Sequence, residues 1–227
     1  MGLRGASTLG LAAVAAVCAV LAGCSVPGAA EQPRPSETSA AEPAVPDASG
    51  GLTFAAVGDS ITDADSPDFM AGDLGAASWA TYVRDAGFGF AGGWAEWGAT
   101  TARMLDEVAA YEADVLVVLA GTNDVAFGVP FAETTSNLER IVDTAGITEV
   151  VVVSIPPIDA DPDGADAFND RLEAVARDRG WRFVDGSAGL RTGDGTFREG
   201  MSSDGLHPSE AGAKVLGEAI AEELGEE

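Results

Sequence analysis

One serine and one histidine, far apart in the chain, could together perform nucleophilic catalysis. Ser60 follows an apolar run that stops at Gly58, and His207 is the only histidine among 227 residues. A serine hydroxyl needs a base of near-neutral pKa to take its proton, and the base needs an anionic partner to fix its tautomer. Asp204 lies three residues before His207 and is the candidate partner. The sequence therefore contains a possible nucleophile, base and acid.

Simpler interpretations exist for these residues. A serine after a strand is often a helix N-cap, which would need no reactivity. A histidine directly before Pro208 could be a surface residue at a helix start. Asp59 and Asp124 are expected to brace their own turns. The carboxylates between Ile61 and Gly72 are expected to form a solvated loop rather than a metal site: Asp63, Asp65 and Asp68.

Buried strands alternate with amphipathic helices in the segment that must position these residues. Short apolar runs predict strands near residues 53–57, 88–94, 114–120, 150–154 and 181–185. Helical spacing of apolar residues predicts helices within 74–86, 101–111, 131–142, 168–176 and 211–220. This alternation is typical of a parallel sheet with helices on both faces. We expect an α/β fold with three layers, α/β/α, around a mainly parallel five-stranded sheet.

Polar residues gather in loops that follow the predicted strands, where α/β proteins bind ligands. The loops are 58–60, 98–101 and 121–124, and a fourth segment carries Asp204 and His207. These four blocks, in this chain order, resemble those of the SGNH/GDSL hydrolase family. The resemblance covers nearly all of residues 52–224 and implies the flavodoxin-like fold of that family.

The resemblance implies a role for each matching residue. Ser60 would be the nucleophile, His207 the general base, and Asp204 the group that orients His207. The N–H groups of Ser60 and Gly98 and the side-chain amide of Asn123 would form the oxyanion hole. We expect neither a metal ion nor a cofactor. Gly98 could instead be an ordinary turn glycine, and Asn123 could cap the turn that follows it.

The second block departs from the family pattern. An asparagine often precedes the glycine of that block, whereas this chain has the sequence Trp-Ala-Glu-Trp-Gly at 94–98. The departure affects the expected shape of the acyl pocket, not the nucleophile. Trp94 and Trp97 flank Gly98 and are candidates for substrate contact, although tryptophans more often lie in the core. The G-x-S-x-G sequence of α/β-hydrolases is absent.

The first 50 residues are expected to lie outside the fold. Arg4 and the apolar run 9–21 indicate a signal peptide over residues 1–23, since the run is too short for a membrane span. The sequence Leu-Ala-Gly-Cys at 21–24 resembles a bacterial lipobox, which implies that Cys24 is lipidated. Ordinary cleavage nearby, leaving Cys24 as a free thiol, is the alternative. Residues 24–50 hold five of the eleven prolines and are predicted to form a disordered tether.

These segments place the domain 51–227 outside the cytoplasm. The chain has two cysteines, and Cys18 would leave with the signal peptide, so no intramolecular disulfide is expected after cleavage. We expect a lipid-anchored, extracytoplasmic protein that acts as a monomer.

The strong acidity of the chain excludes some partners. A formal net charge of −25, from 37 acidic and 12 basic residues, leaves no basic surface for nucleic acid. It also argues against electrostatic attachment to anionic lipids. Membrane association would depend on the acyl chains at Cys24.

An esterase that uses an acyl-enzyme is the function the sequence favours. Its substrate would be a small-molecule or glycan ester, such as an O-acetylated glycan, or a lipid ester at the cell envelope. A non-catalytic, glycan-binding surface lipoprotein is the alternative from another class. A metal-dependent phosphodiesterase would need several convergent ligands. The loops 61–73, 155–166 and 186–203 are expected to shape the pocket.

Overall fold

The computed structural model describes residues 51–226. The predicted signal peptide, Cys24 and the tether at 24–50 lie outside the described residues, so their assignments stay predictions.

Five strands form one sheet in which every neighbouring pair is parallel. Their order across the sheet is β2-β1-β3-β4-β5. The first strand, β1, lies inside the sheet, and β2 forms one edge beside it. The remaining strands β3, β4 and β5 follow in order on the other side of β1. The strand bounds are β1 Thr53–Gly58, β2 Gly89–Ala95, β3 Val115–Leu119, β4 Glu149–Val153 and β5 Arg182–Val184.

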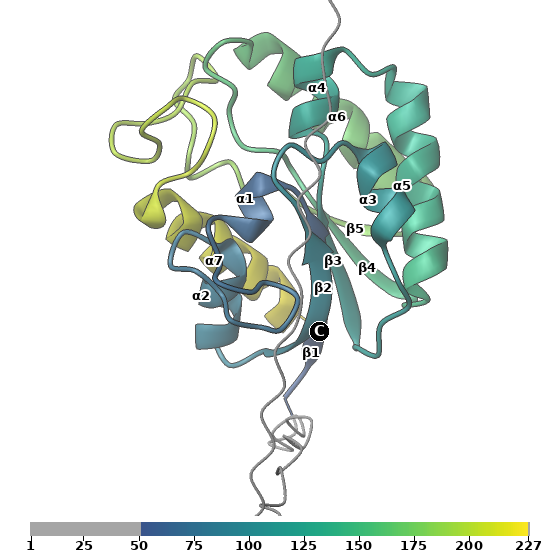
Figure 1. Cartoon of the computed structure of the whole chain (residues 1–227). Coiled ribbons are helices and arrows are strands. Elements are labelled where there is room, and N and C mark those ends of the chain that lie inside the picture. The colour runs from purple at the N-terminus through teal and green to yellow at the C-terminus, as the bar shows by residue number, and fades with distance from the viewer. Residues whose placement is uncertain (1–50, 227) are drawn as a thin grey trace, which may run out of the picture. The chain divides into compact units, whose positions relative to one another are not determined.

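Seven helices connect and cover the strands of the described chain. They are α1 Ser60–Asp63, α2 Trp79–Asp85, α3 Thr101–Glu107, α4 Thr122–Phe127, α5 Phe131–Ala145, α6 Pro162–Arg179 and α7 Glu210–Gly225. Figure 1 shows α1, α2 and α7 on one side of the sheet and α3 to α6 on the other. None of these helices combines the length and the apolar character that a membrane span requires. The predicted three-layer α/β/α architecture with five parallel strands is confirmed.

Each face of the sheet has its own hydrophobic core, because alternate residues of a strand point to opposite faces. In β3, Leu116 and Val118 pack with α3, α5 and α6, whereas Val117 and Leu119 pack with α2 and α7. Burial on both faces explains why β3 reads as a continuous apolar run. The fully buried Trp79 of α2 is the largest side chain of the second core.

The structure differs from the predicted elements mainly at loops and ends. Two short helices, α1 and α4, begin directly after the Gly58 and Gly121 turns, where irregular loops were expected. The predicted helix 101–111 ends at Glu107, and α6 begins six residues before Phe168. Helices of one or two turns carry too few apolar residues to show a period, so hydrophobic spacing does not detect them.

Candidate active site

Ser60 lies where β1 turns into α1. Asp59, not Ser60, is the N-cap of this helix, and its Oδ1 accepts a hydrogen bond from the Ile61 N–H at 3.0 Å. The N-cap interpretation of Ser60 is therefore wrong. Ser60 is the first residue of the helix, where a backbone N–H has no acceptor within the helix. The side chain and the free N–H of Ser60 therefore both lie beyond the carboxyl end of β1.

The structure brings Ser60, His207 and Asp204 into one hydrogen-bonded chain. Ser60 Oγ lies 3.0 Å from His207 Nε2, although 147 residues separate them. His207 Nδ1 lies 2.7 Å from Asp204 Oδ2. Because the carboxylate can only accept when ionised, Nδ1 carries the proton and Nε2 faces the hydroxyl as an acceptor. This is the arrangement in which an imidazole takes a proton from serine.

Asp204 is held in its ionised form by donors from its own loop. Its Oδ1 accepts hydrogen bonds from the backbone N–H groups of Leu206 at 2.9 Å and His207 at 2.8 Å. Partial desolvation raises the pKa of Asp204, but the hydrogen bonds from the His207 side chain and from these two N–H groups outweigh it and hold the pKa well below its usual range. The carboxylate of Asp204 therefore stays ionised at any pH at which a neutral imidazole can act as the base.

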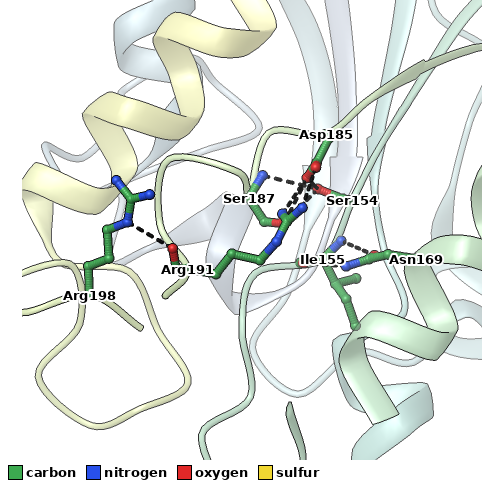
Figure 2. A network of polar contacts seen from close by, with 7 residues as sticks. All are labelled: Ser154, Ile155, Asn169, Asp185, Ser187, Arg191 and Arg198. Atoms are coloured by element: carbon green, nitrogen blue, oxygen red, sulfur yellow. Dashed lines mark hydrogen bonds and ion pairs between the residues drawn. The ribbon is translucent and has the colours of Figure 1, made fainter. Parts of the chain in front are cut away.

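A polar cluster around two buried serines secures the long loop that leads from β5 to His207. Figure 2 shows the guanidinium of Arg191 directed at the carboxylate of Asp185, with Nη1 2.7 Å from Oδ1. Ser154, at the end of β4, donates to Asp185 Oδ1 at 3.2 Å and accepts from the Ser187 N–H at 3.0 Å. Arg198 then donates to the Arg191 carbonyl oxygen at 2.8 Å. The start of the loop is therefore tied to the sheet.

Asp159 secures the other end of the same loop. Its Oδ1 accepts the Phe197 N–H at 2.8 Å, and its own N–H donates to the Gly205 carbonyl oxygen at 2.9 Å. Gly205 has φ +77°, and a Cβ there would lie 2.9 Å from Asp159. A side chain at 205 would thus push against the residue that positions the Asp204–His207 segment.

The predicted oxyanion-hole residues lie on three separate elements. Asn123 is in the first turn of α4, and its Nδ2 donates to the Ala99 carbonyl oxygen at 3.0 Å and to Asp59 Oδ2 at 3.3 Å. Gly98 is exposed, with φ +74°. Among the backbone hydrogen bonds of residues 51–226, none is donated by the Gly98 N–H. Asn123 therefore reaches across to the loops that hold Gly98 and Ser60.

Asp59 is a buried carboxyl beside the nucleophile. Its side chain is fully buried. Burial is the main cause that raises the pKa of Asp59 to about 7, and the charge of Asp124 adds to it, while the Ile61 N–H and His207 act in the opposite direction. As expected, Asp59 braces its own turn, but it also contacts Asn123. This second contact could not be predicted from the sequence, because Asn123 is 64 residues away.

Asp124 connects α4 to two other helices instead of bracing its own turn. Its Oδ2 accepts the Thr101 N–H at 2.9 Å, and its Oδ1 accepts the hydroxyls of Thr101 at 2.5 Å and Thr134 at 2.8 Å. It is 1 % exposed. The side chain of Asp124 therefore connects α3, α4 and α5, rather than bracing its own turn as predicted from the sequence. These contacts fix the helix that presents Asn123.

Trp97 covers the imidazole, whereas Trp94 belongs to the core. The Trp97 ring centroid lies 5.0 Å from that of His207, and its Nε1 donates to Asp63 Oδ2 at 2.8 Å. Trp97 is 50 % exposed and Trp94 is 6 % exposed.

Within residues 51–226, no three His, Cys, Asp or Glu side chains are grouped as metal ligands. Asp63 instead positions the indole, a role that sequence reasoning missed.

A cavity of about 270 Å³ opens at the Ser60–His207 pair. It is lined by Ser60, Ile61, Ala64, Asp65, Ala77, Trp97, Ser203, Asp204, His207 and Pro208. The loop 61–73 contributes to this lining as expected, and the loop 186–203 contributes only Ser203. The loop 155–166 does not line it, because it is used to secure the loop that carries His207.

Comparison with known proteins identifies the family. A model of the GDSL-like lipase/acylhydrolase family matches residues 56–215. No curated protein gives a significant match to the chain.

Three solved structures show the similarity of the fold. A catalytic variant of an acetylxylan esterase from Geobacillus stearothermophilus is 21% identical, with a TM-score of 0.61 over 78% of this chain and 95% of that one. A lipolytic protein of the G-D-S-L family from Veillonella parvula is 19% identical, with a TM-score of 0.60 over 76% and 97%. A GDSL-like lipase from Bacteroides thetaiotaomicron is 19% identical, with a TM-score of 0.57 over 76% and 87%.

Proposed function

Because the chain belongs to the GDSL-like lipase/acylhydrolase family, we propose that it is a serine esterase that removes short acyl groups through an acyl-enzyme on Ser60. The observation that carries this proposal is the continuous chain from Ser60 Oγ to His207 Nε2 at 3.0 Å and from His207 Nδ1 to Asp204 Oδ2 at 2.7 Å. Family membership makes the protein a serine ester hydrolase, and this geometry supports the roles proposed for the three residues.

Acylation begins when Ser60 Oγ attacks the carbonyl carbon of the ester. His207 Nε2 takes the hydroxyl proton, and the resulting imidazolium is stabilised by the Asp204 carboxylate. When the tetrahedral intermediate collapses, the bond to the alcohol oxygen breaks and His207 returns the proton to that oxygen. The products are a free alcohol and an ester on Ser60.

Deacylation repeats these steps with water. His207 takes a proton from a water molecule, which attacks the acyl carbon and releases the carboxylic acid and free Ser60. In both halves the negative oxygen is bound by the N–H groups of Ser60 and Gly98 and by the Asn123 amide. Each fixed donor of this kind contributes about 2.7–4 kcal/mol to the transition state.

The size of the cavity favours a short acyl group. Its volume of about 270 Å³ is just below the usual range of about 300–1,000 Å³ for small-molecule sites, and its lining residues do not form a long apolar groove. An acetyl group fits this space beside Trp97. A long lipid chain would have to lie on the protein surface, so we favour acetyl esters over lipid esters.

A glycan is the alcohol partner that we propose for this activity. A half-exposed indole at the rim of the cavity is a suitable surface for a sugar ring, and one structural neighbour is an acetylxylan esterase. The alternative of a non-catalytic glycan-binding protein requires no intact triad, whereas the three groups here are in hydrogen-bond contact. The intact geometry therefore favours hydrolysis.

We also propose that the domain acts outside the cytoplasmic membrane, held by lipid on Cys24. The proposal is supported by the sequence Leu-Ala-Gly-Cys at 21–24 after an apolar run. Expression with a radiolabelled fatty acid would test it: label in the wild type and none in Cys24→Ala is expected, and an equally labelled variant would contradict it.

An ester assay tests the proposed activity directly. The domain is assayed with chromogenic acetyl, butyryl and octanoyl esters, alongside Ser60→Ala and the control Ser136→Ala, an exposed serine of α5 that does not line the cavity. We expect the acetyl ester to react fastest, Ser60→Ala to be inactive, and Ser136→Ala to keep activity. Equal rates for the wild type and Ser60→Ala would refute the proposal.

A further inference from the structure

The cavity at Ser60 carries negative charge without a compensating cation. Two of its ten lining residues are aspartates, Asp65 and Asp204, and none is Lys or Arg. Asp204 is committed to His207, but among the described residues no ion pair involves Asp65. The Asp65 carboxylate is therefore free to interact with a substrate.

Arg103, six residues after Trp97 in the sequence, is already paired with carboxylates. Arg103 donates to Glu96 at 3.0 and 2.9 Å, and to Glu107 at 2.5 Å. Its guanidinium also lies over the buried ring of Trp94, 5.6 Å from the centroid. Arg103 is thus held on the surface of α3 and does not line the cavity.

Asp65 lines the cavity on a segment with an unusual backbone conformation. Ala64 and Asp65 have φ values of +45° and +56°, and they are the only non-glycine residues of the described chain with positive φ. Both line the cavity. The conformation of Ala64 ends α1, since Ala64 is the left-handed C-cap of this helix and its N–H donates to the Ser60 carbonyl oxygen at 2.8 Å.

Trp97 supplies an aromatic surface in the same cavity as this carboxylate. It is half exposed, and the hydrogen bond from its Nε1 to Asp63 fixes the plane of the indole. Burial raises the pKa of Asp63, the hydrogen bond from Trp97 lowers it, and the negative charge of Asp65 raises it further. An indole face with a carboxylate nearby is the combination that binds organic ammonium groups.

From this arrangement, and on the basis of the proposed esterase activity, we infer that the site selects esters by charge: Asp65 and Trp97 favour a substrate with an ammonium group close to the scissile ester. An amino group on the sugar or on the acyl part would satisfy this chemistry. An anionic ester would be repelled by the two lining aspartates and by the net charge of −25. A neutral ester would be neither attracted nor repelled by these charges, so its rate would lie between those of the cationic and anionic esters.

Three thioacetates of nearly equal shape test the inference. They are acetylthiocholine, its uncharged isostere with a tert-butyl group in place of trimethylammonium, and an analogue with a carboxylate at that position. The measured quantity is the ratio of kcat/KM values. We expect the cationic ester to exceed the neutral one about tenfold at low salt, and the anionic ester to be the slowest.

Two variants locate the origin of the ratio. Asp65→Asn keeps the shape and the preference for positive φ while removing the charge, and Trp97→Leu removes the aromatic face. Both should bring the cation-to-neutral ratio close to one. Asp73→Asn removes one charge from the same loop at an exposed position that does not line the cavity, and should leave the ratio unchanged.

Binding separates this inference from the esterase proposal. Acetylcholine is titrated into Ser60→Ala and into the double variant with Asp65→Asn, with calorimetry as the readout. Binding that weakens about tenfold on loss of Asp65 supports charge selection even if no ester is turned over. A wild-type ratio near or below one, or a ratio and an affinity that survive Asp65→Asn, would overturn the inference.

Discussion

Asn123 Nδ2 lies 3.3 Å from Asp59 Oδ2, so the amide proposed for the oxyanion hole is bound to the carboxyl beside the nucleophile. The same nitrogen donates to the Ala99 carbonyl oxygen at 3.0 Å. The two N–H bonds of the amide are therefore both in use before substrate binds. The longer and weaker contact, with Asp59, is the one that an oxyanion would share or replace.

Replacing Asn123 should slow catalysis without unfolding the domain. Asn123→Ala removes one oxyanion donor, and we expect kcat/KM for an acetyl ester to fall about 100- to 1,000-fold. The melting temperature should change little, because the side chain is only half buried. Steady-state kinetics and thermal unfolding of the same samples check both points. A loss of less than about threefold would remove Asn123 from the oxyanion hole.

Asp59 should make the stability of the domain depend on pH. Its pKa of about 7 in the folded state lies above its ordinary value, so the folded state binds the proton more tightly than the unfolded chain does. The stabilisation is complete below about pH 4 and is lost as pH rises to about 7, amounting to ~4 kcal/mol at most. Asp59→Asn, whose Oδ1 can still accept the Ile61 N–H, should not show this loss.

Thermal unfolding of the wild type and Asp59→Asn between pH 4 and 8 measures the difference. As pH rises from 4 to 8, the melting temperature of the variant should increase relative to that of the wild type. Asp106→Asn, at an exposed position on α3, is the matched control and should parallel the wild type. Parallel curves for Asp59→Asn as well would show that this carboxyl does not carry the pH dependence.

Asp204→Asn should impair the base without removing it. The substitution replaces the acceptor of the His207 Nδ1 proton and favours the wrong tautomer, so kcat should fall about 100- to 10,000-fold. The half-exposed side chain of Asp204 places the expected loss nearer the lower figure. Because Asp204 does not contact the acyl group in this mechanism, KM should stay within about threefold. An unchanged kcat would mean that His207 needs no acid partner.

Gly121→Ala should destabilise the protein and the site together. Gly121 has φ +127°, and a Cβ there would overlap the ring of Phe168. We expect a loss of about 2–4 kcal/mol in the free energy of unfolding and a lower kcat, because Gly121 begins the helix that presents Asn123. Gly193→Ala, where a Cβ would meet nothing within 4 Å, should be nearly neutral. Equal denaturation midpoints for the two variants would contradict this.

The strands and long helices could be predicted because their burial is regular. β3 and β4 are apolar on both faces, and α5 repeats its buried residues at helical spacing. The meeting of Ser60 and His207 beyond the carboxyl end of β1 was predicted from the resemblance of the four blocks to a known family. The short helices α1 and α4 could not be predicted, since their formation depends on caps and tertiary contacts.

Contacts between distant polar residues were the main features that the sequence did not reveal. Asp124 binds Thr101 and Thr134 across three helices, and Asp63 orients Trp97 from 34 residues away. A carboxylate has no periodicity that names its partner, and in an acidic chain a buried aspartate looks like a solvated one. Family resemblance predicted the reacting groups and Asp204 as the partner of His207, but not the contacts of Asp59, Asp63 and Asp124.

Covalent labelling of Ser60 tests the central claim most directly. The domain is treated with a fluorophosphonate, its intact mass and residual esterase activity are followed together, and the modified peptide is sequenced by mass spectrometry. We predict one adduct per chain, located on Ser60, with activity lost in proportion to labelling, and a much slower reaction in His207→Ala. Complete labelling of Ser60 without loss of activity, or full inhibition with the adduct on another residue, would contradict the mechanism.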